Sequence, residues 1–184
     1  KDASNPGLDS SKITFLGALE FGNRRECWDI IVKTSPNDIK SLYNTRYDLF
    51  SAPQLKSFLK RSGGLYLNIH KECLHEQENQ SCEGVRFATL LSAKGLVFSQ
   101  PCSSVDQAEY EGLIDFLDIH RMGHRIQQII NVPVHERQEI ADMRARMFKE
   151  RFDAFRIFTM NGVRTLFAVE HLARNQTIPQ WSIV

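Results

Sequence analysis

The sequence predicts an α+β protein with a mainly antiparallel sheet built from hairpins. Segments rich in strand-forming residues come in pairs joined by turn sequences, and helix-like segments are inserted between the pairs instead of alternating with single strands. The two longest helical segments lie in the C-terminal half. With 42% hydrophobic and 24% charged residues, the composition is that of a globular protein. We therefore expect a single α+β domain over residues 12–184.

The first 33 residues contain a polar stretch followed by the first predicted hairpin. Residues 1–11 are polar, carry Asn5-Pro6-Gly7, and are expected to be a flexible lead-in. Residues 13–21 and 27–33 are rich in strand formers. The turn-forming residues 22–25 between them make a hairpin the simplest interpretation.

Two short helices are predicted next, and a serine with a nearby proline marks the start of each. Ser35-Pro36 opens a helix over about residues 37–50, because proline suits the first helical position. Ser51-Ala52-Pro53 opens a second helix, which runs to about Arg61 and is stopped by Gly63-Gly64.

Strand character returns after this glycine pair. Residues 65–73 form a predicted strand, and residues 85–92 and 96–100 form a second hairpin around Ala93-Lys94-Gly95. Further along the chain, Asn161-Gly162 between apolar runs favours a third hairpin within residues 154–170, with a helix broken at the glycine as the alternative.

The C-terminal half contains a predicted helix pair, residues 104–153. Ser103 or Ser104 can cap the first helix, which runs to about Asn131. Val132-Pro133-Val134 breaks it, and the second helix follows from about His135. A break this short favours two helices packed antiparallel, as a protruding or dimerising substructure.

Charge and motifs exclude several classes of protein. Lysine and arginine total 23 against 22 aspartates and glutamates, so no global basic field favours nucleic acid. No apolar stretch approaches the roughly 20 residues of a membrane helix, and we expect no membrane insertion. The common nucleotide-binding loops, the nucleophile elbow and the HExxH zinc motif are absent. We therefore expect no cofactor, and the balance is against an enzyme.

The cysteines leave three alternatives open. Cys73 and Cys82 bracket a polar segment and lie near His70 and His75. The favoured interpretation gives them no covalent or metal role, since a chain of this length needs no disulfides, and this favours an intracellular over a secreted setting. A Cys73–Cys82 disulfide is the second alternative and a zinc site the third.

A row of arginines is the most unusual feature of the second helix. Arg137, Arg144 and Arg151 are spaced one heptad apart, and the latter two fall in the middle of its apolar face. A buried guanidinium needs a partner. The alternatives are a carboxylate of the same chain, a bound anion, or a second copy of the chain across an interface. On the preceding helix, His120 and His124 stand one turn apart on the apolar face, where paired core histidines are commoner than metal ligands.

These observations predict a non-catalytic regulatory or protein-interaction domain that acts through its 104–153 helix pair, in one version as a homodimer. The methionines, phenylalanines and arginines of this pair are enriched in interfaces. The first alternative is a small-anion-binding enzyme or sensor that uses Arg144 and Arg151, with His120 and His124 as proton-transfer groups. The second is a nucleic-acid-binding protein, which the interleaved acidic residues disfavour.

Overall fold

The computed structural model describes residues 12–48, 52–60, 64–74 and 80–153. The chain divides into two compact units, Lys1–Phe148 and Lys149–Val184. The first unit contains the sheet, and the described part of the second is the end of one helix with the residues up to Asp153. The predicted lead-in over residues 1–11 and the predicted hairpin within residues 154–170 lie outside the described residues.

Strands and helices alternate along the chain. The elements in order are β1 (Ile13–Leu16), α1 (Arg24–Thr34), the 3₁₀ helix η1 (Lys40–Leu42), β2 (Tyr43–Arg46), α2 (Ala52–Leu59), β3 (Leu65–Asn68), α3 (Gly84–Ser92), β4 (Leu96–Ser99), α4 (Ser104–Glu109), β5 (Ile114–Phe116), α5 (Ile119–Ile130) and α6 (Val134–Arg151). Across the described ranges, no helix combines the length and the apolar character needed to cross a bilayer.

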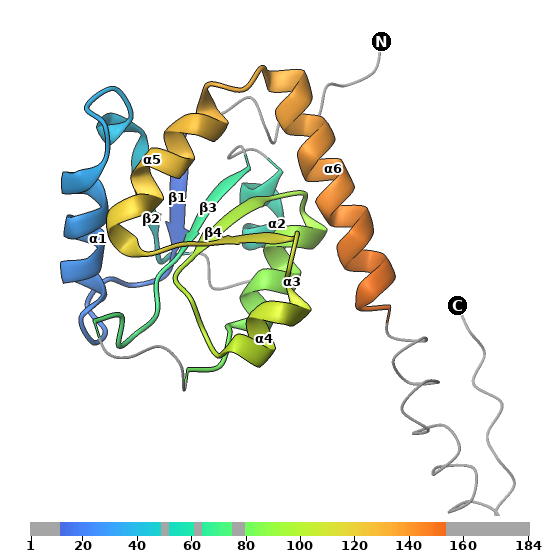
Figure 1. The fold of residues 1–184 in the computed structure, drawn as a ribbon, viewed down its shortest axis with the longest axis horizontal. Coiled ribbons are helices and arrows are strands. Elements are labelled where there is room, and N and C mark those ends of the chain that lie inside the picture. Colours follow the sequence, from blue (N-terminus) through green and yellow to red (C-terminus); the bar gives the residue numbers. More distant parts are fainter. Residues whose placement is uncertain (1–11, 49–51, 61–63, 75–79, 154–184) are drawn as a thin grey trace, which may run out of the picture. The chain divides into compact units, whose positions relative to one another are not determined.

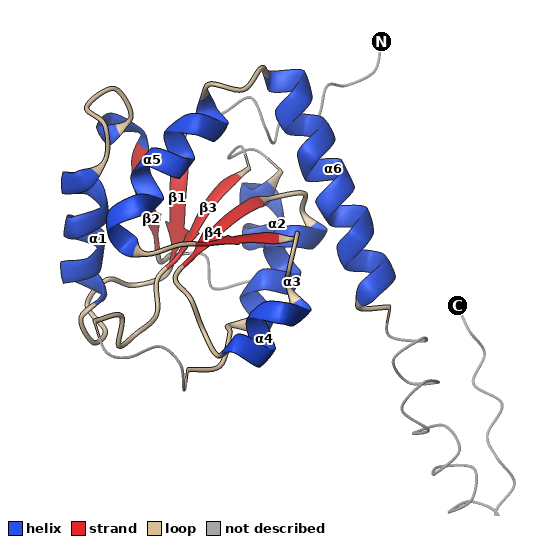
Figure 2. Cartoon of the chain, viewed as in Figure 1, coloured by secondary structure: helices blue, strands red, loops and turns tan. Residues whose placement is uncertain are grey.

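The sheet is parallel, with the strand order β2-β1-β3-β4-β5 (Figures 1 and 2). Strand β1 pairs with β2 on one side and with β3 on the other, and all four strand pairs are parallel. The fold class is therefore α/β, and the predicted α+β fold with a mainly antiparallel sheet is wrong. A parallel sheet needs a crossover between successive strands, and the helices provide it.

Both misassigned hairpins contain a helix in place of their supposed strand. Residues 27–33 belong to α1, whose buried Cys27 and Ile31 are four residues apart, as on one helical face. Residues 85–92 belong to α3, whose buried Phe87, Leu90 and Leu91 have the same spacing. The β-branched and aromatic residues favoured strands locally, and burial against the sheet overrode that preference.

Some of the predicted helices are confirmed, and others are wrong. The helix opened by Ser51-Ala52-Pro53 and the break between α5 and α6 are confirmed. The helix predicted over residues 37–50 is instead η1 followed by β2. The long helix predicted from Ser104 to Asn131 is divided into α4, β5 and α5, with Gly112 at a positive φ of 77° in the turn before β5. Helix α5 packs against α1 rather than lying antiparallel beside α6.

The main core lies on the face of the sheet covered by α1 and α5. Alternate strand residues supply one side of it, among them Phe15, Leu67 and Phe98, and the two helices supply the other. Close approach of the helices depends on Gly123 of α5, because a Cβ there would lie 2.8 Å from the Cα of Ser35 and would overlap its hydroxyl.

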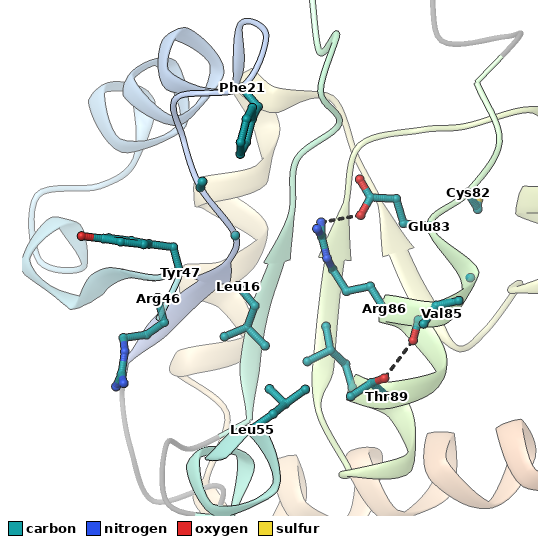
Figure 3. A pocket seen from close by; sticks show the side chains of 14 residues that line it. Leu16, Phe21, Arg46, Tyr47, Leu55, Cys82, Glu83, Val85, Arg86 and Thr89 are labelled. Carbon is teal, nitrogen blue, oxygen red and sulfur yellow. Dashed lines mark hydrogen bonds and ion pairs between the residues drawn. The ribbon is translucent and has the colours of Figure 1, made fainter. Parts of the chain in front are cut away.

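Helix α3 covers the opposite face of the sheet, where α2 also lies (Figures 1 and 3). Tyr66 of β3 is fully buried on this face and lies against the turn that joins α3 to β4. The rings of Phe87 and Tyr110 meet edge to face, with centroids 5.1 Å apart. Both faces of the sheet are thus covered, which explains why β3 and β4 are buried along their whole length.

Replacing Gly123 by alanine should lower the free energy of unfolding by about 1–3 kcal/mol, because the new methyl group pushes α5 away from Ser35. Urea denaturation measures this loss. His124→Ala, at the exposed neighbouring position, is the control and should change stability by no more than about 0.5 kcal/mol. Equal stability of the glycine and alanine proteins would show that the two helices are less tightly packed than described.

Candidate functional site

The carboxyl edge of the sheet, where all five strands end, contains a point at which neighbouring connections diverge. The chain leaves β1 toward α1 on one face of the sheet, and it leaves the adjacent β3 toward α3 on the other. Loops that part in this way open a crevice outside the strand ends, and ligands of open α/β sheets bind in such crevices. The order β2-β1-β3-β4-β5 places this crevice between β1 and β3.

A pocket of about 950 Å³ opens beside this point (Figure 3). The end of β1, the end of β2, helix α2 and the first turns of α3 form its walls. The lining residues are Leu16, Gly17, Ala18, Phe21, Arg46, Tyr47, Leu55, Cys82, Glu83, Gly84, Val85, Arg86, Thr89 and Leu90. Most of them are apolar, and the charged groups are few, which is the usual constitution of a small-molecule pocket.

Two charged lining residues, Glu83 and Arg86, form a cluster with Arg24, which adjoins the pocket without lining it. The third charged lining residue, Arg46, is paired with Asp48. Glu83 lies 2.6 Å from Nη1 of Arg86 through one carboxylate oxygen and 3.3 Å from Nη2 of Arg24 through the other. Arg24 also donates from Nε to the carbonyl oxygen of Ile69, at 3.1 Å. Among the described residues, no other carboxylate lies within ion-pair distance of either arginine. The cluster therefore has one more positive than negative charge.

Arg86 is anchored to the ends of the central strands. Its Nη1 donates to the side-chain oxygen of Asn68 at 2.6 Å, and the amide nitrogen of Asn68 donates to the hydroxyl of Ser99 at 3.0 Å. Asn68 and Ser99 are completely buried at the ends of β3 and β4. Burial lowers the pKa of the Arg86 guanidinium, and the nearby Glu83 charge acts in the opposite direction. The charged guanidinium is thus poorly solvated, and a negative group that approaches it stabilises the charged form.

The ring of Phe15 supports both guanidinium groups from below. The guanidinium carbons of Arg24 and Arg86 lie 5.8 Å and 5.6 Å from the ring centre. This is within the range of cation–π attraction. Phe15 of β1 therefore helps to position both arginines at the carboxyl edge of the sheet.

The loop after β1 is fastened to the loop after β3. Gly22 has a φ of +60° and lies so close to the carbonyl of Lys71 that a side chain would not fit. The next residue, Asn23, donates its backbone N–H to that carbonyl at 3.1 Å and accepts a bond from the N–H of Cys73 at 2.7 Å. These bonds hold Arg24 at the start of α1, beside the site.

Two disulfides reinforce this edge, Cys27–Cys73 and Cys82–Cys102, with Cα separations of 6.4 Å and 5.4 Å. The Cys73–Cys82 bridge considered from the sequence is wrong, and so is the favoured interpretation without a covalent role. The sheet order explains the actual pairing. The hydrogen bonds between the loops after β1 and β3 bring Cys27, in the first turn of α1, to Cys73, while the adjacency of β3 and β4 brings Cys82 to Cys102.

The histidine and cysteine cluster does not assemble as a zinc site in the described residues. His70 is buried, and its Nε2 lies 2.9 Å from the carbonyl oxygen of Pro101; burial lowers its pKa. His75 lies outside the described residues. The ligand atoms of Cys82, Cys102 and Asp106 lie within 4.8 Å of one another, a separation that a metal could bridge, but the two sulfurs are bonded to each other.

The three arginines of the predicted heptad row have separate environments. Arg144 lies 2.8 Å from a carboxylate oxygen of Asp115, which Arg125 also contacts at 3.0 Å, so a carboxylate of the same chain is confirmed as its partner. Arg144 contacts Oδ2 of Asp115 and Arg125 contacts Oδ1, so each carboxylate oxygen has one guanidinium neighbour. Arg137 is buried, with Nε and Nη1 unpaired, and Arg151 is exposed in the second unit.

His120 and His124 are both exposed on α5, so the prediction that they lie on its apolar face is wrong. Asp118 caps this helix by accepting a bond from the backbone N–H of His120 at 2.8 Å. Within the described ranges, neither imidazole contacts Arg137 or Arg144. The structure therefore does not bring together the residues of the predicted anion site.

Sequence reasoning missed Arg24, Glu83 and Arg86. Arg24 and Glu83 are 59 residues apart in the sequence, and they meet because β1 and β3 are neighbours, a pairing that the sequence did not predict. A signal was available in the short continuous apolar runs of β1, β3 and β4, which are typical of strands buried on both faces. Had these runs been interpreted as strands of a parallel sheet, the residues that follow each strand would have been the expected site residues, because ligands bind at the carboxyl ends of such strands.

Comparisons with family models, with curated proteins and with solved structures gave no significant match to this chain. The function is therefore argued from the pocket and its charged groups.

Replacing Glu83 by glutamine should lower the free energy of unfolding by about 1–3 kcal/mol, because both arginines lose a charged partner. Chemical denaturation measures the change. Glu20→Gln is the matched control, since the Glu20–Arg25 pair is more than half exposed and should contribute less than about 1 kcal/mol. If the two variants prove equally stable, Glu83 does not organise this edge.

Replacing Arg144 by methionine should cost about 1–3 kcal/mol of stability, because Asp115 is then left buried with Arg125 as its remaining partner. Arg146→Met, an exposed substitution on the same helix, serves as the control. Thermal unfolding followed by circular dichroism compares the two. An unaltered melting temperature for Arg144→Met would assign this arginine a role other than holding α6 to β5.

Proposed function

We propose that this domain binds a small anionic ligand, with a phosphate-like group, in the pocket at the carboxyl edge of β1 and β3. The observation that carries the proposal is the Arg24–Glu83–Arg86 cluster, in which two guanidinium groups share one carboxylate beside an open pocket. A guanidinium presents several N–H donors in a plane and matches phosphate or carboxylate oxygens well. The remaining positive charge is available to a ligand.

The position of the cluster supports the proposal independently of its charge. It stands where the connections of β1 and β3 diverge, the place where open α/β sheets bind ligands. It also adjoins the first turn of α3, whose cap residue Glu83 makes no side-chain capping bond. The partial positive charge of a helix N-terminus adds to the attraction for an anion.

The rest of the pocket suggests a ligand with an apolar portion as well. Phe21 and Tyr47 are 58% and 64% exposed, and both line the pocket. Apolar side chains that line a pocket can contact the apolar part of a small molecule. A ligand that places its anionic group against Arg86 could bring its apolar atoms against the lining side chains of Leu16 and Phe21.

This proposal keeps the ligand class of one sequence-based alternative and changes its residues. Arg144 has an internal carboxylate partner and lies on the edge strand side, at β5. Interaction through the 104–153 helix pair, and nucleic-acid binding, stay predictions. No described feature favours either over the pocket.

Inorganic pyrophosphate is a suitable probe of the anionic subsite. Titration calorimetry at low salt should detect one bound pyrophosphate per chain, and Arg86→Met should weaken the binding about tenfold, the equivalent of one lost charge-assisted hydrogen bond. Arg25→Met removes an exposed arginine of α1, next to Arg24, and should bind like the unaltered protein. Equal binding by the Arg86 and Arg25 variants would contradict the proposal.

The Glu83→Gln variant provides a second, more discriminating test. Its carboxylate competes with a ligand for the two guanidinium groups, and we therefore expect tighter pyrophosphate binding from a less stable protein. If Glu83 had only a structural role, its replacement by glutamine would lower both the stability of the protein and its affinity for pyrophosphate. Lower stability together with higher pyrophosphate affinity supports the proposal. A decrease in both quantities counts against it.

A further inference from the structure

Both disulfides end in the connection between β3 and α3, yet they differ in accessibility. Cys27 and Cys73 are buried, and so is Cys102. Cys82 is only partly buried, and it lines the pocket. A small reductant can therefore approach the Cys82–Cys102 bridge from the pocket, at the sulfur of Cys82, while the Cys27–Cys73 bridge is shielded by the core.

The accessible bridge adjoins the charged group that organises the site. Cys82 immediately precedes Glu83, and its carbonyl accepts a bond from the N–H of Gly84 at 2.8 Å. Through the bridge, the segment immediately before α3 is covalently attached to the loop that follows β4. The N–H of Cys82 also donates to Asp106 of α4 at 2.9 Å. The position of Glu83 thus depends on a covalent bond one residue away.

We propose that the Cys82–Cys102 disulfide is a redox-sensitive clamp that controls ligand affinity at the proposed anion site, an inference that rests on the proposed function. A dithiol reductant opens it in two exchanges. Its first thiolate attacks Sγ of Cys82, the Cys82–Cys102 bond breaks, and Cys102 leaves and takes up a proton. The second thiol of the reductant then displaces Cys82, which is also protonated. Two electrons and two protons pass to the cysteines, and the reductant becomes a cyclic disulfide.

Opening the bridge makes the start of α3 less ordered. Glu83 and Arg86 then have to be ordered again when the ligand binds, and this ordering weakens affinity. The strand pairings and the main core do not include this bridge, so we expect the sheet to persist and the effect to be confined to the pocket wall. The oxidised protein is the form that binds tightly.

The first measurement does not depend on a ligand. The folded chain is treated with increasing dithiothreitol, alkylated, and mapped by peptide mass spectrometry. We expect Cys82 and Cys102 to be labelled at reductant concentrations that leave Cys27 and Cys73 bonded. Labelling of all four cysteines together, or of none before the chain unfolds, would overturn the inference.

The second measurement is pyrophosphate binding by the oxidised and the selectively reduced chain, with circular dichroism to confirm that both are folded. We expect reduction to weaken binding by about fivefold or more. The Cys82→Ser/Cys102→Ser double variant should bind like the reduced chain and be insensitive to the reductant.

The outcomes separate the two proposals. If the oxidised chain binds no pyrophosphate, the proposed function is wrong, and the clamp as a control of that site is wrong with it, whatever the labelling gives. If the oxidised chain binds and the reduced chain binds equally well, the proposed function stands and the clamp is wrong.

Discussion

Strand β1 is hydrogen-bonded in parallel on both of its edges, and the rest of the architecture depends on this position. Parallel neighbours cannot be joined by tight turns, so every connection returns along the outside of the sheet through a helix or a loop. The connections after β1 and β3 part to opposite faces, and this opens the pocket between them. Core packing by Phe15 and the support of two arginines by its ring are consequences of the same strand.

At the pocket, the carboxylate of Glu83 is the point where the separate parts of the chain meet. It joins α1 to α3 through Arg24 and Arg86, and it stands next to the bridge that attaches this segment to the loop after β4. A half-buried carboxylate between two guanidinium groups is more favourable than either charge left without a partner. The same arrangement leaves one positive charge in excess, so the groups that stabilise this edge are also those to which we assign the proposed anion binding.

Local sequence signals were most reliable where chain chemistry alone decides the conformation. Proline at the start of α2 and the Val132–Pro133 break before α6 act through the backbone, and both predictions hold. The stretches now in α1 and α3 are rich in residues that also suit strands, and their helical conformation depends on the face they bury against the sheet. The short apolar runs of β1, β3 and β4 have no polar alternation that would reveal their partners.

By itself, the sequence determined the positions of the breaks and the need for a partner at Arg144, because proline geometry and the cost of a buried charge are local properties. Only the tertiary structure decided the order of the strands, that Cys27 joins Cys73 and Cys82 joins Cys102, and that Asp115 is the partner of Arg144. These outcomes depend on which strands become neighbours. The pairing of β1 with β3 unites residues from the first and middle thirds of the chain, and no local signal encodes that choice.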